Sequence, residues 1–99
     1  MNISKEAIEK VKELNELSIK LHGGEKETAD YLLSSIRSHA EEISELFSSG
    51  DQHWKVETGD LIVQCMRILS LYGTDLNEMF GKGSSRVKNK IKELLRESQ

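Results

Sequence analysis

The chain has 99 residues, which suits a single domain but makes it hard for one copy to enclose a deep active-site cleft. Hydrophobic residues make up 36% and charged residues 31%, a polar balance that still excludes a disordered chain. The net charge of −3 is unevenly spread, because residues 1–81 carry 8 basic and 15 acidic side chains whereas residues 82–99 carry 6 basic and 2 acidic ones.

The first two predicted helices are amphipathic. Ser4 is a suitable N-cap for the first, and His22-Gly23-Gly24 ends it because glycine readily adopts the left-handed conformation that closes a helix. The second is expected from about Glu27 to Ser48 and ends at Gly50. Apolar residues recur at helical spacing along one side of each, at Ala7, Ile8, Val11, Leu14, Leu17 and Leu21, then at Ala29, Leu32, Leu33, Ile36, Ala40, Ile43 and Phe47.

The third predicted helix, from Asp51 or Gln52 to Tyr72, is apolar on nearly every side, which is typical of a buried helix. Asp75 and Glu78 then have capping-box spacing. Gly81-Lys82-Gly83 is expected to break the chain before a last helix that turns four apolar residues inward: Val87, Ile91, Leu94 and Leu95. The fold class is therefore all-α, with one domain over residues 1–99 and four to five helices in an antiparallel bundle.

The compartment follows from the cysteine and from the hydropathy. The single cysteine, Cys65, allows no internal disulfide and favours a reducing, intracellular compartment. The first residues do not resemble a signal peptide, and the longest apolar stretch is far short of the ~20 residues that cross a bilayer. We expect a soluble, cytoplasmic protein with no membrane partner.

Two pairs of carboxylates, eleven residues apart, are the main functional signal. Glu42 and Glu45 form the first pair, and Glu57 and Asp60 form the second. Residues three apart lie on one face of a helix, so each pair can direct two carboxylates at one place. Oxygen donors of this kind are the ligands that Mg²⁺ and Mn²⁺ prefer.

The second pair belongs to a polar stripe on the most apolar helix. Glu57, Asp60, Gln64 and Arg67 fall within about 80° of one another, and buried carboxylates without partners would be costly. One interpretation is a divalent cation, with Gln64 and Arg67 supporting its ligands. The other is an ion-pair network through Arg67. From this helix alone the two are about equally favoured.

The first pair is open to a plainer interpretation, a solvated acidic face on the second helix. Ser35, Ser38 and Ser49 flank it, however, and small side chains allow another helix to come close. The tight loop around Ser49-Gly50-Asp51 predicts that the second and third helices pack as an antiparallel hairpin. The two acidic faces can then meet at a similar height.

These residues resemble a known family. Glu42-x-x-Glu45, the Glu41-Glu42 doublet and the string Glu57-Thr58-Gly59-Asp60-Leu61-Ile62 look like the MazG-like all-α nucleoside triphosphate pyrophosphohydrolases. The resemblance covers roughly residues 36–92. It implies helical subunits that associate as homodimers or homotetramers and complete their core in that way. It also implies Mg²⁺-dependent cleavage of a (deoxy)nucleoside triphosphate to the monophosphate and pyrophosphate.

Carried over by position, the resemblance assigns the metal ligands to the two carboxylate pairs: Glu42, Glu45, Glu57 and Asp60. It assigns contacts with phosphates or base to Lys82, Arg86, Asn89 and Lys90. Phosphoanhydride hydrolysis also needs an activated water. A glutamate not fully used as a ligand can take the proton of that water, and Glu45 is the first choice for this role and Glu41 the second.

Other residues have simpler interpretations. His39 precedes Glu42 by three residues, but a partly exposed or hydrogen-bonded histidine is favoured over a di-iron ligand. The lysines of the last helix lack interleaved aromatic residues, so no nucleic-acid partner is expected. The competing function is a non-catalytic helical module derived from the same fold, which would serve oligomerisation or would bind a nucleotide or a protein.

Overall fold

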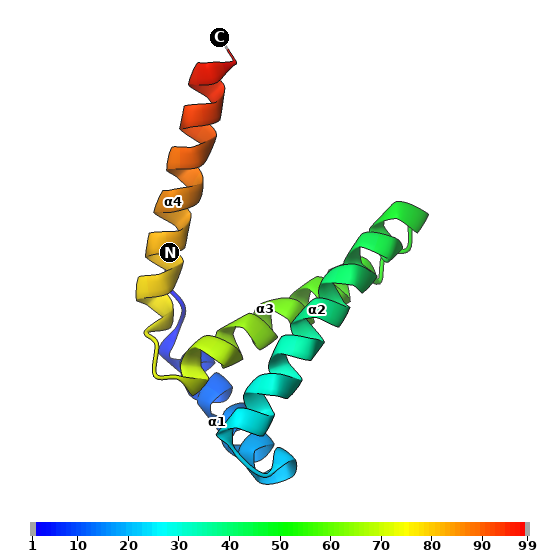
Figure 1. Ribbon diagram of the computed structural model, residues 1–99, viewed down its shortest axis with the longest axis vertical. Coiled ribbons are helices and arrows are strands. Elements are labelled where there is room, and N and C mark those ends of the chain that lie inside the picture. Colours follow the sequence, from blue (N-terminus) through cyan, green and yellow to red (C-terminus); the bar gives the residue numbers. More distant parts are fainter. Residues whose placement is uncertain (1, 99) are drawn as a thin grey trace.

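The structure is a computed structural model that describes residues 2–98, and the regular structure in that range is helical. Four helices follow one another there, α1 (Lys5–His22), α2 (Glu25–Ser49), α3 (Trp54–Leu71) and α4 (Leu76–Glu97) (Figure 1). The predicted all-α fold class is confirmed, with the smaller of the two predicted numbers of helices.

Local side-chain and backbone chemistry sets the helix ends. Ser4 caps α1, because its Oγ accepts a hydrogen bond from a first-turn N–H at 3.1 Å. Gly23 and Gly50 close α1 and α2 in the left-handed conformation, with φ of 92° and 79°. Asp75 caps α4, since its Oδ1 accepts from the Glu78 N–H at 2.9 Å. The predicted ends of α1 and α2 and the predicted cap of α4 are thus confirmed.

The predicted break at Gly81-Lys82-Gly83 is wrong, because α4 runs without interruption from Leu76 to Glu97. A glycine inside a helix costs only about 1 kcal/mol relative to alanine. The Asp75 cap and the apolar spacing that continues beyond the glycines favour the helix on both sides of this point. Two glycines alone do not outweigh them.

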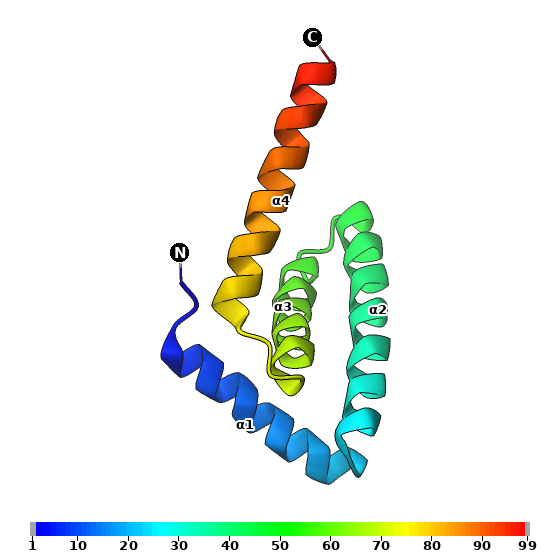
Figure 2. The same cartoon turned by 60° about the vertical axis from the view of Figure 1, so that its left-hand side comes forward.

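The helices α2 and α3 lie side by side as the predicted antiparallel hairpin, and α1 crosses the end of that hairpin far from its loop (Figure 2). A small core forms where these helices meet. It contains Val11 of α1, Ala29 and Leu32 of α2, and Leu76 at the start of α4. The helix α4 then diverges from the hairpin and projects away from it (Figures 1 and 2).

The segment before α1 is attached to the start of α4. The Ile3 N–H donates to Asn77 Oδ1 at 2.6 Å, and Asn77 Nδ2 donates to the Ile3 carbonyl oxygen at 3.4 Å. These two bonds join positions that are 74 residues apart in the chain.

Much of the apolar surface stays uncovered in a single copy. The radius of gyration is 16.1 Å, whereas a compact domain of 100 residues has about 13 Å. The prediction that the third helix is buried is wrong for this chain, because Ile62 is 57% exposed and Cys65 is exposed as well. The predicted inward face of the last helix is also exposed, at Val87, Ile91, Leu94 and Leu95. Both errors have one cause, which is that α4 does not fold back over α3.

A groove of about 630 Å³ follows the uncovered side of α3. Its floor is Leu61, Ile62, Cys65 and Leu69 of α3, and Met79 and Phe80 of α4 close one end. None of the helices in residues 2–98 combines the length and the apolar character needed to cross a bilayer.

Candidate metal centre

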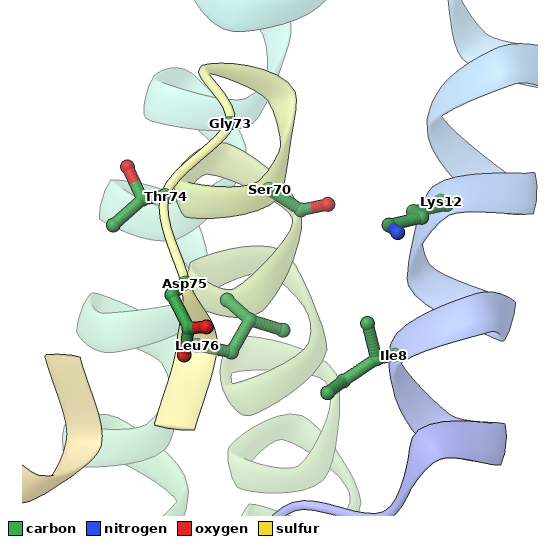
Figure 3. A pocket seen from close by; sticks show the side chains of 7 residues that line it. All are labelled: Ile8, Lys12, Ser70, Gly73, Thr74, Asp75 and Leu76. Atoms are coloured by element: carbon green, nitrogen blue, oxygen red, sulfur yellow. The ribbon is translucent and has the colours of Figure 1, made fainter. Parts of the chain in front are cut away.

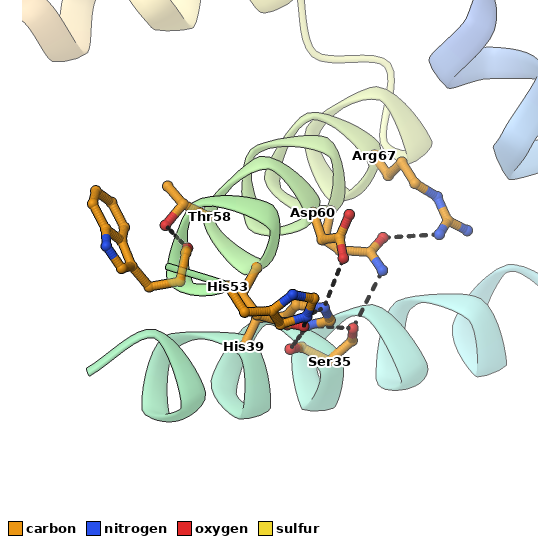
Figure 4. A network of polar contacts seen from close by, with 9 residues as sticks. Ser35, His39, His53, Thr58, Asp60 and Arg67 are labelled. Carbon is orange, nitrogen blue, oxygen red and sulfur yellow. Dashed lines mark hydrogen bonds and ion pairs between the residues drawn. The ribbon is translucent and has the colours of Figure 1, made fainter. Parts of the chain in front are cut away.

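The α2–α3 hairpin brings one histidine and two carboxylates together. His39 lies on α2, and Glu57 and Asp60 lie in the first two turns of α3. Figure 4 shows His39 and Asp60 facing each other across the hairpin. His39 Nε2 is 3.3 Å from Glu57 Oε2 and 3.8 Å from Asp60 Oδ2. One ligand atom from each of the three lies within 4.8 Å of the other two, so they form a group that can hold one ion.

The three side chains differ in exposure. The side chain of Glu57 is 12% exposed, that of His39 is 20% exposed and that of Asp60 is 57% exposed. The second oxygen of Glu57, Oε1, is 3.3 Å from Nε2 of His53. Glu57 therefore lies between two imidazoles, which can compensate the burial of its charge when they are protonated.

The ring of His39 is fixed from behind by its own helix. Its Nδ1 lies 2.8 Å from the backbone carbonyl oxygen of Ser35 and 3.2 Å from Ser35 Oγ. A carbonyl oxygen can only accept a hydrogen bond, so Nδ1 carries the proton and donates it. The other ring nitrogen, Nε2, is then directed at the two carboxylates.

Hydrogen bonds continue from this group across the hairpin as far as Arg67 (Figure 4), and from Arg67 they reach α1. Ser35 Oγ accepts from Gln64 Nε2 at 3.2 Å, and Gln64 Oε1 accepts from Arg67 Nη1 at 2.8 Å. Arg67 Nε donates to Asn15 Oδ1 at 3.2 Å, and Asn15 Nδ2 donates to the Arg67 carbonyl oxygen at 3.0 Å. One connected polar network thus links α1, α3 and α2 and ends at His39.

Within the polar stripe, the buried charge of Arg67 is compensated by hydrogen bonds to neutral oxygens. Its relative exposure is 7%, and its third side-chain nitrogen donates to Ser18 Oγ. Its acceptors are therefore the neutral oxygens of Asn15, Gln64 and Ser18, and the alternative in which it pairs with acidic groups is wrong. Burial lowers the pKa of Arg67 from its usual value, and the nearby Tyr31 acts in the opposite direction.

The structure gathers only part of the predicted ligand set. Glu57 and Asp60 converge as predicted, but Glu42 and Glu45 are exposed on α2 and do not belong to the three-residue group. Glu41, the second choice for a general base, is exposed as well. In the single chain, the four carboxylates are not assembled around one point.

The predicted phosphate contacts lie on α4, far along the chain from the hairpin. Lys82, Arg86, Asn89 and Lys90 are all exposed. Lys82 Nζ pairs with Glu78 Oε1 of the same helix at 2.8 Å. Because α4 diverges from the hairpin, the chain's own α4 does not bring these groups to His39 (Figure 1).

His39 is the member of the group that the sequence did not predict as a ligand. The expectation of a hydrogen-bonded, partly exposed histidine is confirmed, but its contact with Glu57 and Asp60 was missed. A signal was present, since His39 shares a helix face with Glu42 and with Ser35. Which of these residues would face α3 depended on the rotation of α2 about its axis, and a helical pattern alone fixes that rotation only to within the width of its apolar stripe, about 100°.

A second, smaller hollow of about 290 Å³ lies between α1 and the α3–α4 connection (Figure 3). Its polar side chains are Lys12, Ser70, Thr74 and Asp75, and its apolar ones include Ile8 and Leu76. Asp75 is already engaged as the cap of α4. None of the predicted site residues lines this hollow.

Comparison with known proteins adds no identification: no family model, no curated protein and no solved structure matches the chain.

Proposed function

We propose that the protein is a divalent-cation-dependent nucleotide pyrophosphohydrolase, which converts a (deoxy)nucleoside triphosphate to the monophosphate and pyrophosphate. The observation that carries this proposal is the convergence of Glu57 and Asp60 with His39 at the α2–α3 hairpin. The resemblance of the Glu57-Thr58-Gly59-Asp60-Leu61-Ile62 string to the MazG-like enzymes supports it. A cytoplasmic location would suit such a substrate.

The convergent residues fit a divalent cation in part. Glu57 and Asp60 would hold Mg²⁺ or Mn²⁺ through carboxylate oxygens, as the resemblance implies. When bound, such an ion supplies charge for the phosphates and lowers the pKa of a bound water. Glu42 and Glu45 would join only after a change of side-chain conformation on the exposed face of α2. Glu45 or Glu41, both exposed there, would accept the proton of the attacking water.

The substrate phosphates need positive charge, which we assign to the basic face of α4, at Lys82, Arg86 and Lys90, with Asn89 beside it. Since the chain's own α4 leads away from the hairpin, these groups would come from another subunit. We therefore include a homodimer or homotetramer in the proposal. The groove along α3 and the exposed apolar stripe of α4 support this, because both are surfaces that isolated monomers rarely leave open.

The test is pyrophosphate release from a panel of nucleoside and deoxynucleoside triphosphates in the presence of Mg²⁺ or Mn²⁺. We expect turnover of at least one of them, and we expect Asp60→Asn to reduce kcat/KM by at least about a hundredfold, since it removes a charged ligand at the reacting phosphate. The matched control is Asp30→Asn, an exposed aspartate of α2 outside the group, which should leave turnover unchanged. Equal activity of the Asp60 and Asp30 variants would contradict the proposal.

A second function is favoured by one specific observation. Glu57 lies between His39 and His53, and two protonated imidazoles can compensate it without any cation. A non-catalytic helical module would need no more than this. The two functions differ in the response to metal: Mn²⁺ should raise the melting temperature of an enzyme with a cation site, and Glu57→Ala with Asp60→Ala should abolish that gain. For the non-catalytic module, Mn²⁺ should have no effect.

A further inference from the structure

We propose that His39 is itself a metal ligand, and that the site formed by His39, Glu57 and Asp60 selects a first-row transition dication (Mn²⁺, Co²⁺, Ni²⁺ or Zn²⁺) over Mg²⁺. Use of the ion in hydrolysis rests on the proposed function, but the binding of the ion does not. The site differs from the four-carboxylate set that the resemblance implies, because one nitrogen donor from α2 takes the place of two glutamates.

The spacing of the three ligand atoms suits such an ion. Metal–ligand bonds of about 2.0–2.1 Å in a tetrahedral site place the ligand atoms about 3.4 Å apart. His39 Nε2 lies 3.3 Å from Glu57 Oε2 and 3.8 Å from Asp60 Oδ2. Small side-chain adjustments therefore suffice to bring all three onto one ion.

The hydrogen bond behind His39 suits a cation ligand when the ring is neutral. Because Nδ1 donates to the Ser35 carbonyl oxygen, neutral His39 presents a lone pair at Nε2. That lone pair and two carboxylate oxygens, Glu57 Oε2 and Asp60 Oδ2, then face one another, three acceptors without a donor between them. A backbone carbonyl that holds the far N–H is also the usual support of a metal-bound histidine, since it fixes the tautomer and the ring orientation.

The ring is held further by the polar network. Ser35 Oγ, which also lies 3.2 Å from Nδ1, accepts from Gln64 Nε2, and Gln64 is held by the buried Arg67. The nitrogen donor is thus oriented by α3 as well as by its own helix. Pre-orientation of this kind raises affinity because less side-chain freedom is lost on binding.

The donor set decides the class of ion. Imidazole suits Mn²⁺, Co²⁺, Ni²⁺ and Zn²⁺, whereas Mg²⁺ prefers an all-oxygen octahedral shell and keeps several waters. Three protein ligands leave at least one position open for water or a phosphate oxygen. The exposed side of Asp60 provides the entry.

A proton on Nε2 would also separate the three acceptors, and the experiment has to distinguish this from a metal. The full-length protein is titrated with Co²⁺, and the visible d–d absorption of the bound ion is followed. We expect saturation at one Co²⁺ per chain, retained in about a hundredfold excess of Mg²⁺ because the nitrogen donor disfavours Mg²⁺. His39→Ala and Asp60→Asn should each weaken Co²⁺ binding by at least about tenfold.

Asp30→Asn is the matched control, since Asp30 is an exposed aspartate of α2 that lies outside the group, and the Co²⁺ affinity of this variant should equal that of the unchanged protein. Asp60→Asn decides the question if His39→Ala disturbs folding, because the Asp60 side chain is more than half exposed. The inference is overturned if Co²⁺ does not bind, if Mg²⁺ displaces it at equal concentration, or if Asp60→Asn weakens its binding no more than Asp30→Asn does. Hydrolysis with Mg²⁺ but without a Co²⁺ site would overturn this inference alone, and a Co²⁺ site without hydrolysis would overturn the proposed function alone.

Discussion

The side chain of Arg67 is held by three hydrogen bonds to side chains of α1 and α3. It is buried and charged, and its side-chain partners are the three neutral oxygens of Asn15, Gln64 and Ser18. Burying a charge without an anion is unfavourable, so these hydrogen bonds are what make the position tolerable. Arg67 thereby holds α1 against α3 and orients Gln64, which in turn contacts Ser35 behind His39.

Substitution of Arg67 should therefore destabilise the fold. Arg67→Ala leaves Asn15 Oδ1 and Gln64 Oε1 without their donor, and hydrogen bonds to charged groups contribute about 1.5–3 kcal/mol each. We expect the free energy of unfolding to fall by about 2 kcal/mol or more, measured by urea denaturation followed by circular dichroism.

The control for this prediction is Arg86→Ala, an exposed arginine of α4, which should change the free energy of unfolding by less than about 0.5 kcal/mol. A stability of Arg67→Ala equal to that of the Arg86 variant would mean that the polar network does not hold the helices together.

At the scale of the helices, α4 is the unusual element. It is amphipathic along its whole length, it begins with a side-chain cap, and it contains two glycines in its first half. An added Cβ would meet nothing within 4 Å at Gly81 or at Gly83. Packing within one chain therefore does not require glycine at either place.

Gly81→Ala should raise the helicity of α4, since alanine in a helix interior is favoured over glycine by about 0.5–1 kcal/mol. The expected result is a more negative mean residue ellipticity at 222 nm near the melting midpoint, together with a higher melting temperature. Gly50→Ala is the opposing control, because Gly50 has a φ of 79° and alanine is strained there. A loss of helicity in Gly81→Ala would show that another surface packs closely on this glycine.

The helix ends and the helix faces were predictable to different degrees. Ser4, Gly23, Gly50 and Asp75 act through the backbone within a few residues, so their roles are legible in the sequence. Even so, the predicted break at Gly81 and Gly83 is wrong, because a glycine ends a helix only where the following chain cannot continue it. Which face of a helix is buried depends instead on the helices that pack against it.

The candidate site was only partly predictable, because it too depends on which helix faces meet. Glu57 and Asp60 share one helix face. The loop between α2 and α3 is short, so α2 was predictable as the helix that packs beside them. The rotation of α2 decided whether His39 or Glu42 would meet them, and this rotation is set by the packing of residues such as Leu32, which lies seven residues before His39 on nearly the same face of that helix. No local pattern contains that information.

At the scale of the whole molecule, a single copy leaves much apolar surface uncovered. Large apolar side chains are exposed along α3 and α4, and the 54 Å length arises largely because α4 projects from the hairpin. The C-terminal residues carry an excess of basic groups, and the rest of the chain carries an excess of acidic groups. Opposite charges favour an approach between the α4 of one copy and the hairpin of another.

The proposed assembly is testable through the apolar stripe of α4. Ile91→Glu removes an apolar side chain worth about 1.5–3 kcal/mol on burial, so we expect the dissociation constant of the homo-oligomer to rise at least about tenfold. Sedimentation velocity over a concentration series measures this. Ser85→Glu, on the opposite face of α4, introduces the same charge and should leave the assembly intact. Sedimentation of the unchanged protein as a monomer at all concentrations would contradict the proposal.

Cys65 offers a second test of the proposed assembly, at the α3 groove. Although the residue is exposed, partial burial of its thiol raises the pKa, so less of the reactive thiolate is present at neutral pH than in a free cysteine. Because Cys65 also lines the α3 groove, its alkylation by iodoacetamide should be slow in the assembly. The rate should increase on dilution, and its rise with pH should begin at a higher pH than in the urea-unfolded chain. A rate equal to that of the unfolded chain at every pH and concentration would contradict both expectations.

The two hydrogen bonds between Ile3 and Asn77 restrict the movement of α4 relative to the rest of the chain. They fasten the first turn of α4 to the segment before α1, so the connection at Thr74 and Asp75 is not a free joint. A movement that closes the angle between α4 and the hairpin would have to pivot beyond Asn77 or break both bonds. Beyond Asn77, α4 contains Gly81 and Gly83 next to Ser84, and glycine and serine pairs are among the places where helices bend.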